Sequence, residues 1–231
     1  MPKTFKFIIL FFAFSIPLSV KAINEKKLTV VNLIESSEDT LKILNQNSDI
    51  QNFQKYLSKS RAILIFPEVY EGGFIFGAKG GNGILLIKKG ERFTGPFFYS
   101  LGGLSIGLQA GAKSARVVMT VMTHRGVKSI LKERVKLGVD VDAVVVTGGV
   151  GYSAESTPRL ADVYSFSDND GLFVGTSIEG SYLQPRNDLN KVIYKKNLSS
   201  DEIINYQSFN KETDDLTKII SRITKDVKNN N

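Results

Sequence analysis

The chain of 231 residues contains no cysteine, no tryptophan and a single histidine, His124. Without cysteine it can have no disulfide framework, no thiolate metal site, no cysteine nucleophile and no acylated lipoprotein cysteine. One histidine also excludes a metal centre built from several imidazoles. These absences remove many catalytic and metal-binding classes, and we expect the protein to use no cofactor.

Positive charge is only modestly in excess of negative charge. The chain carries 30 Lys and Arg against 23 Asp and Glu, a formal net charge of +7. Residues 1–22 contain three lysines and no acidic residue, which leaves +4 for the remainder. This excess is compatible with an anionic membrane surface as partner, but it is too small to indicate a nucleic acid. We therefore expect no nucleic acid partner.

Residues 1–22 have the pattern of a secretory signal peptide. Lys3 and Lys6 precede an apolar run from Phe7 to Ile16, and the segment ends at Ala22. The run is shorter than the roughly 20 residues that a membrane-spanning helix needs. We therefore expect an exported protein, periplasmic or extracellular and possibly peripheral on a membrane. An uncleaved anchor is the alternative to a cleaved signal.

The densest structural signals lie in residues 61–88. Three short apolar runs, Ala62–Phe66, Phe74–Phe76 and Ile84–Ile87, are separated by Pro67 and by clusters of glycine. Short runs rich in Ile and Phe between such breaks predict buried strands. Glycine continues to recur inside the next apolar segments, which is typical of bulges, bends and close approach of backbones. The pattern indicates an antiparallel sheet that curves.

Helices are predicted before, within and after this sheet. Apolar stripes with helical spacing run through residues 24–45, 49–59, 124–136 and 211–228. The predicted fold class is α+β: a curved, mostly antiparallel, Gly-rich β-sheet, partly closed and barrel-like, with N-terminal, internal and C-terminal helices. The expected organisation follows the chain, with a signal peptide (1–22), N-terminal helices packed on the domain (23–60), a β-rich core (61–196) and a C-terminal amphipathic helical tail (197–231).

Two short motifs resemble catalytic or nucleotide-binding sequences without their structural context. Gly103–Gly107 fits the G-x-S-x-G pattern of a serine hydrolase, but strand-like residues follow where a helix is required. Gly149–Ala154 fits a dinucleotide fingerprint, but loop-forming residues follow it. We therefore predict a protein that is not an enzyme.

The ordered glycine motifs resemble those of the SYLF domain over roughly residues 30–195. This is a lipid-associated module found in exported bacterial proteins and in eukaryotic membrane-trafficking and actin-patch proteins. The resemblance implies structural roles for the residues that match its motifs, which are Pro67, Gly73, Gly83, Gly107, Gln109, Gly111, Gly151, Gly171, Gly175 and Gly180. Gly149 stands where the family usually has proline. The resemblance also implies non-catalytic binding of lipid, phospholipid or a membrane.

The first candidate membrane-binding segment is a basic turn followed by aromatic residues. It comprises Lys88, Lys89, Arg92, Phe93 and Phe97. Cations of such a loop can meet phosphate head groups while rings enter the acyl boundary. The alternative is a solvated turn followed by aromatic residues of the core.

The second candidate segment is the amphipathic helix predicted over residues 211–228. It places Lys218 and Arg222 beside its apolar stripe, so it could lie on a membrane or dock on its own domain. The primary hypothesis is thus a non-catalytic protein of the bacterial cell envelope that binds anionic phospholipid or a membrane surface. The alternative is an envelope protein-interaction or scaffold module without direct lipid binding. Whether lipid would bind at a surface or in a cavity stays open.

Overall fold

The computed structural model describes residues 5–48, 50, 52–146, 161–168, 180–208 and 211–229. Side chains are described in these ranges except at 5–22, 74–76, 105–111, 212 and 226–229. The predicted motif residues Gly151, Gly171 and Gly175 lie outside the described residues, as does the segment Gly149–Ala154. The side chain of Gln109 is also outside them.

One long hairpin dominates the fold. β1 (Ala62–Lys89) and β2 (Arg92–Val121) pair antiparallel along their length, from Ala62 opposite Val121 to Lys89 opposite Arg92. The sequence predicted separate strands, broken at Pro67 and at the glycines. In the structure these breaks are irregularities within a continuous strand, and the first shift of register falls between Phe66 and Val69. Proline is tolerated there because a bulged residue needs no ladder hydrogen bond.

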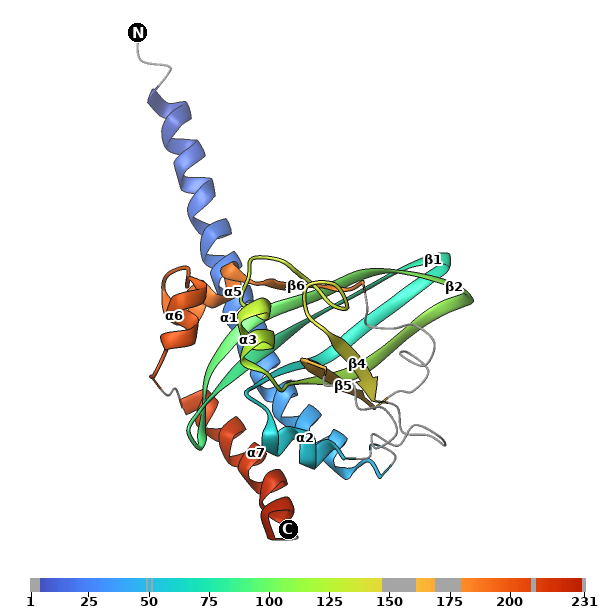
Figure 1. The fold of residues 1–231 in the computed structure, drawn as a ribbon. Helices are drawn as coiled ribbons and strands as arrows, with labels where there is room; N and C mark the ends of the chain where they lie inside the picture. Colours follow the sequence, from blue (N-terminus) through green and yellow to red (C-terminus); the bar gives the residue numbers. More distant parts are fainter. Residues whose placement is uncertain are drawn as a thin grey trace.

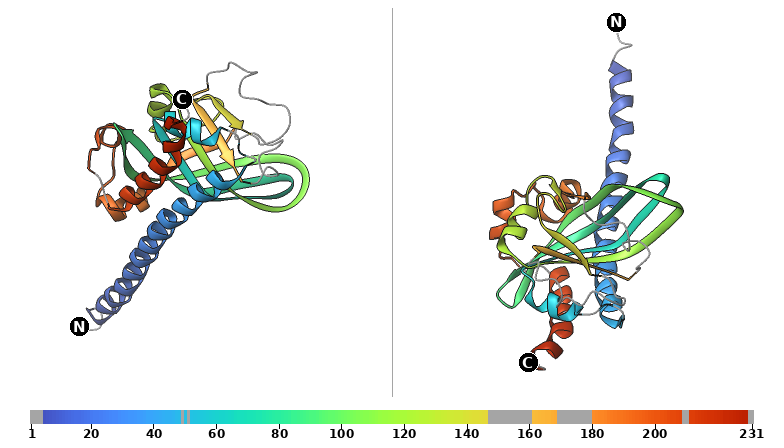
Figure 2. Two further views of the ribbon diagram at one scale, coloured as in Figure 1. Left: turned by 90° about the horizontal axis from the view of Figure 1, so that it is seen from below. Right: turned by 45° about the vertical axis from the view of Figure 1, so that its right-hand side comes forward.

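This ribbon folds back on itself. The second half of β1 crosses the first so closely that a Cβ atom on Gly83 would lie 2.3 Å from the carbonyl oxygen of Ile65. Near the other end of the strand, the backbone N–H of Lys88 donates to the carbonyl oxygen of Arg61 at 2.8 Å. Figures 1 and 2 show the resulting curved ribbon. The predicted α+β class with a curved, partly closed sheet is confirmed.

The remaining strands extend the sheet from β2. They are β3 (Val135–Lys136), β4 (Ala143–Val146), β5 (Val163–Ser167) and β6 (Tyr182–Pro185). β6 pairs with β2 near its start and with β3, while β5 pairs with β2 near its end. These pairings and that of β1 with β2 are antiparallel, whereas β4 and β5 are parallel. The sheet is therefore mostly antiparallel, as predicted.

Helices lie on both sides of this sheet (Figure 1). They are α1 (Phe5–Gln46), α2 (Phe53–Lys59), α3 (His124–Ile130), α5 (Asn187–Tyr194), α6 (Ser200–Asn205) and α7 (Lys211–Asn229). The segment predicted as a signal peptide forms the first part of α1, which extends away from the rest of the molecule (Figures 1 and 2). Within the described helices, none combines the length and the apolar content needed to cross a bilayer.

The predicted internal helix over residues 124–136 is only partly correct. α3 ends at Ile130, and Val135 and Lys136 instead form β3, where Val135 lies opposite Leu183. Both Val135 and Leu183 are fully buried. The apolar residues have helical spacing, but this segment forms a strand because β6 supplies hydrogen-bond partners for its backbone and Val135 is buried in the core.

The core lies on both faces of the sheet. Ile63 and Ile65 of β1 pack into a cluster with side chains of α1, α2 and α7. Leu64 and Phe66 point the other way, into a second cluster that includes residues of α3 and α6. A strand buried on both faces has no polar side to present to water. This is why the run Ala62–Phe66 is continuously apolar rather than alternating.

Candidate binding surfaces

The predicted basic turn is held against three helices. Lys88 Nζ donates to the carbonyl oxygen of Ser58, in the last turn of α2, at 3.2 Å. Lys89 Nζ donates to the carbonyl oxygen of Ile204 in α6. Arg92 Nη2 lies 2.5 Å from Asp214 Oδ1 in α7. The cations of this turn therefore serve contacts within the domain, and binding a head group would compete with those contacts.

The two aromatic residues predicted to enter a membrane belong to the core. Phe93 is 4% exposed and Phe97 is fully buried. The ring of Phe97 stacks on Tyr194, with the ring centroids 5.5 Å apart, and also meets the edge of Tyr206. The structure does not present either phenylalanine at the surface, so the alternative of core aromatics describes this segment better.

The C-terminal amphipathic helix is docked on its own domain. Its apolar residues Leu216, Ile220 and Ile223 are buried, and α7 packs against α1, α2 and β2. Lys218 and Arg222 remain exposed, and Lys218 Nζ lies 2.7 Å from Asp215 Oδ1. The apolar stripe of this helix is thus already used for packing, and Lys218 and Arg222 lie on its solvent-facing side.

The predicted motif residues that the structure describes shape the ribbon. Pro67 lies at a bulge, and Gly73 lies opposite Gly111 where the ribbon turns back. Gly107 pairs with Ile75 in the same region. Gly180 has a φ of 82°, a left-handed conformation that favours glycine, directly before β6.

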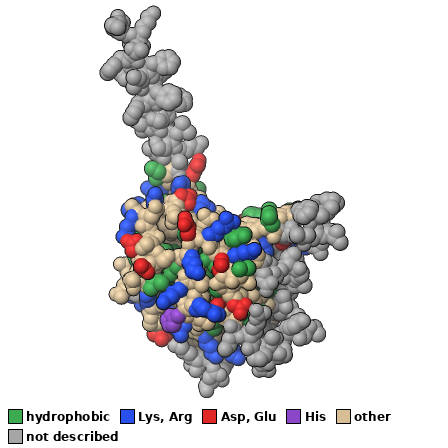
Figure 3. Space-filling view, turned by 45° about the horizontal axis from the view of Figure 1, so that its top comes forward, with side chains coloured by type: hydrophobic (Ala, Val, Ile, Leu, Met, Phe, Trp, Pro, Cys, Tyr) green, Lys and Arg blue, Asp and Glu red, His purple; other side chains and the backbone are tan. Residues whose placement is uncertain are grey.

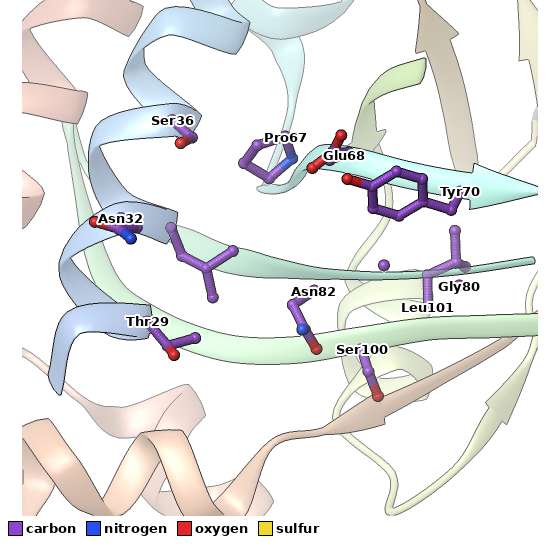
Figure 4. Close-up of a pocket in the computed structure, with 12 residues that line it drawn as sticks. Thr29, Asn32, Ser36, Pro67, Glu68, Tyr70, Gly80, Asn82, Ser100 and Leu101 are labelled. Carbon is purple, nitrogen blue, oxygen red and sulfur yellow. The ribbon is translucent and has the colours of Figure 1, made fainter. Parts of the chain in front are cut away.

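A hollow of about 550 Å³ opens between α1 and the ribbon; we call it the α1–ribbon hollow (Figure 4). Its lining comes from α1, from both halves of β1 and from β2, and comprises Thr29, Asn32, Leu33, Ser36, Pro67, Glu68, Tyr70, Gly80, Gly81, Asn82, Ser100 and Leu101. The space exists because Gly80 and Gly81 place no side chain where the two halves of the ribbon cross. The α1 side chains that face this crossing are mostly short and polar, so they do not fill the gap.

Asn82 is held in this hollow by a relay of hydrogen bonds. Its Oδ1 accepts a hydrogen bond from Nη1 of Arg186. Two further nitrogens of Arg186 donate to the carboxylate of Asp188, at 2.9 and 3.0 Å. These hydrogen bonds lower the pKa of Asp188 to about 2, against the opposing effect of partial burial. Reasoning from the sequence missed this group because Asn82 and Arg186 lie far apart along the chain.

A second hollow of about 540 Å³ lies beside Pro67 and Glu68 and shares Ser36 with the first. Its charged groups include Arg116 and Asp168, whose side chains form an ion pair at 2.7 Å. Arg116 also donates its backbone N–H to the same carboxylate at 2.8 Å. Arg116, the one cation among the described residues that line this hollow, is therefore paired within the protein.

Four cations at the end of α3, in the turn after it and in β3 form a surface that we call the basic face, which was not among the segments predicted from sequence. It comprises Lys128, Lys132, Arg134 and Lys136. The guanidinium carbon of Arg134 lies 4.0 Å from the centre of the Tyr182 ring, and Lys136 Nζ lies 5.7 Å from it. Figure 3 shows Lys and Arg side chains gathered around the chain's one histidine, His124, with acidic side chains interspersed. Residues 124–136 contain five cations and one acid, and this excess of positive charge could have indicated the basic face from the sequence alone.

Two acidic groups of the neighbouring segments, Asp162 and Asp140, are engaged within the protein, whereas Glu133 is exposed between Lys132 and Arg134. Asp162, which is 2% exposed, accepts hydrogen bonds from Arg125 and from Thr123. These bonds lower its pKa although burial acts in the opposite direction and is the largest single influence. Asp140 Oδ2 accepts the backbone N–H of Lys136 at 2.7 Å. In the described part of the chain, no three His, Asp or Glu side chains are grouped so as to hold a metal ion.

Comparison with known proteins adds one family and several relatives. The family model described as "Ysc84: Las17-binding protein actin regulator" matches residues 102–223. The SH3 domain-containing protein PJ696.02 of Schizosaccharomyces pombe is 26% identical over 62% of this chain and 35% of its own length. Protein YSC84 of Saccharomyces cerevisiae is 28% identical over 64% and 33%. The SH3 domain-containing YSC84-like protein 1 of Xenopus laevis is 27% identical over 71% and 52%. The chain thus spans between a third and about half of the length of these relatives.

Proposed function

Because the chain belongs to the Ysc84 family of SYLF-domain proteins, we propose that it is a non-catalytic protein that binds anionic phospholipid at a membrane surface. We further propose that it is exported and acts in the bacterial cell envelope. The relatives bear names that describe binding and regulation, and this supports a binding role rather than a catalytic one. The charge of this chain's surface supports an anionic ligand.

The observation that carries the proposal is the basic face. Within the described part of the chain, Lys128, Lys132, Arg134 and Lys136 form no ion pair with an acidic side chain. Each cation near an anionic membrane contributes about 1 kcal/mol of attraction. Neither of the two hollows is lined by these residues. A group of long cations, of which Lys128, Lys132 and Arg134 are exposed, suits an extended anionic surface.

Co-sedimentation with liposomes tests the proposal. The variant K128E/K132E/K136E reverses three cations of the basic face, and K55E/K59E/K218E makes the same change of net charge at three exposed lysines of α2 and α7. We expect wild-type binding to rise with the content of anionic lipid and to fall with salt. The basic-face variant should lose binding, while the control variant should retain most of it.

Two outcomes would contradict this assignment. Failure of the wild-type chain to bind any liposome would rule out direct membrane binding as its function. Equal loss of binding in both variants would show that net charge, rather than this surface, drives the association. A third variant, with Lys88, Lys89 and Arg92 changed to Ala, tests the turn predicted from sequence, and we expect it to bind like wild type unless it unfolds.

Protein interaction is the second candidate function. Relatives in Saccharomyces cerevisiae are named LAS seventeen-binding protein 3, which describes binding to another protein. In this chain Tyr70 and Leu104, both on the ribbon, are 58% and 86% exposed, and a protein partner would bury them on contact. A scaffold would bind its partner without liposomes and would be indifferent to lipid charge. Retention of a partner in lipid-free pull-downs, lost in Tyr70→Ala/Leu104→Ala, would support this alternative.

A further inference from the structure

We propose that the α1–ribbon hollow is a binding site for a neutral saccharide, independent of the membrane-binding surface. Its volume of about 550 Å³ lies within the range of small-molecule sites. More than half of its lining residues carry a hydroxyl, amide or carboxylate, and Leu33, Pro67, Tyr70 and Leu101 add apolar surface. A ligand that fits this mixed lining has both hydrogen-bonding groups and an apolar face.

The hydrogen-bonding groups of α1 match the hydroxyl groups of a sugar. Asn32 and Ser36 lie one turn apart on the same face of the helix (Figure 4). In the described part of the chain neither side chain is engaged in a hydrogen bond. An amide and a hydroxyl can each donate and accept, as a sugar hydroxyl does. The wall formed by α1 can therefore bind neighbouring hydroxyls without requiring a charge on the ligand.

The opposite wall presents a positioned donor. Asn82 gives its Oδ1 to Arg186, so its NH₂ group is left to donate to a ligand. Arg186 is itself fixed by its two hydrogen bonds to Asp188. The guanidinium of Arg186 is therefore hydrogen-bonded within the protein. The group that faces the hollow is the oriented amide of Asn82 rather than a cation.

An exposed aromatic ring stands at the edge of the hollow. The Tyr70 hydroxyl donates to the Glu68 carboxylate, and this bond raises the pKa of Tyr70. Figure 4 shows the Tyr70 ring beside Glu68, above the part of β1 that carries Gly80 and Asn82. A pyranose has an apolar face of C–H groups, which can pack on an aromatic ring while its hydroxyls reach the polar walls. An open polar hollow with one exposed ring suits this combination.

The charge of the lining disfavours other ligands. Among the lining residues Glu68 alone is ionisable with a charge at neutral pH, so a phosphate or carboxylate would meet no cation there. The Glu68 carboxylate accepts the Tyr70 hydroxyl, and its remaining acceptor positions can accept hydroxyl groups of a sugar in the same way. The donor set thus favours a neutral polyhydroxylated ligand.

Titration of the full-length chain with chitotriose, cellotriose and maltotriose tests this proposal. Saturation-transfer NMR identifies contact with the sugar, and calorimetry gives the affinity. We expect at least one trisaccharide to bind with a Kd of about 1 mM or tighter. Tyr70→Ala should weaken binding by about fivefold, whereas Tyr70→Phe, which keeps the ring, should stay within about twofold of wild type.

A second variant fills the hollow from within. A Cβ atom on Gly80 would meet only the carbonyl oxygen of Leu101, at 3.6 Å, so Gly80→Val is expected to fold and to block the sugar. Val139→Ala changes an exposed side chain outside the ribbon and the hollow, and this variant should bind sugar like wild type. The absence of binding to all three sugars would overturn the proposal. So would binding unaffected by both Tyr70→Ala and Gly80→Val, or trilysine binding that is lost in Glu68→Gln.

Discussion

A Cβ atom on Gly81 would lie 2.3 Å from the backbone carbonyl oxygen of Glu68. The two residues belong to the same strand, and they meet because the ribbon of β1 and β2 folds back between them. The crossing brings backbone against backbone, so neither side can move away as a flexible side chain would. This contact fixes the distance between the two halves of the ribbon and thereby the width of the α1–ribbon hollow.

Substitution of Gly81 by Ala should destabilise the protein strongly. The methyl group would overlap backbone atoms of Glu68 and Val69, and relieving that overlap requires the crossing to open. We expect a loss of about 3 kcal/mol in the free energy of unfolding, measured by urea denaturation. Gly80→Ala is the control, because its Cβ has space, and it should change stability by less than about 1 kcal/mol. Similar losses for both variants would contradict this account of the crossing.

Asn190 should be needed for the position of α5 on the sheet. It is 1% exposed, its Oδ1 accepts the backbone N–H of Phe98 at 2.8 Å, and its Nδ2 donates to the carbonyl oxygen of Phe98 at 3.3 Å. Asn190→Ala leaves both backbone groups buried without these partners. We expect a loss of about 2 kcal/mol in thermal or urea unfolding. Asn187→Ala, at an exposed position of the same helix, should be nearly neutral.

Local patterns in the sequence predicted the buried strands but not the continuity of the ribbon. The run Ala62–Phe66 is apolar at every position, and the structure buries all of it. Pro67 and the glycines after it indicated chain breaks, because a local pattern does not distinguish a turn from a bulge. Pairing with β2 makes these positions irregularities within one strand rather than turns. That pairing joins residues up to 59 positions apart, Ala62 and Val121.

The candidate sites were predicted less well for the same physical reason. A basic turn beside aromatic residues fits both a membrane loop and a packed corner, and contacts from α2, α6 and α7 make it the latter. The α1–ribbon hollow depends on Asn82, Arg186 and α1, which only tertiary structure brings together. By contrast, the basic face is local in sequence and could have been found by counting charges.

The ion pair of Asp188 with Arg186 should make stability depend on pH in acid. The pKa of Asp188 is about 2 in the folded protein, below the value of about 3.9 expected when unfolded. A carboxyl whose pKa is depressed by folding stabilises the protein above its unfolded pKa, and this contribution is lost as pH falls towards 2. We expect Asp188→Asn to be less stable than wild type at pH 6, with the difference shrinking between pH 4 and pH 2.

Urea midpoints of both proteins across that range provide the measurement. Other carboxyls, such as that of Glu202, also have a lowered pKa and will titrate in both proteins, so the quantity to follow is the difference between the two curves. Asp201→Asn, at an exposed carboxyl on α6, is the matched control and should run parallel to wild type. A constant difference between wild type and Asp188→Asn down to pH 2 would show that the charge of Asp188 does not contribute.

The docking of α7 predicts that substitutions of two neighbouring residues of that helix change the free energy of unfolding by very different amounts. Leu216 is fully buried among side chains of α1, α2 and the sheet, so Leu216→Ala should cost about 3 kcal/mol in the free energy of unfolding. Lys218 is exposed, and in the described part of the chain its ion pair is with Asp215 on the same helix, so Lys218→Ala should change stability by less than about 0.5 kcal/mol. If α7 instead left the domain to lie on a membrane, its apolar face would contribute little to stability in solution. Leu216→Ala would then unfold at the same urea concentration as wild type. Undocking of α7 would in that case add no free-energy cost to the binding of lipid by this helix.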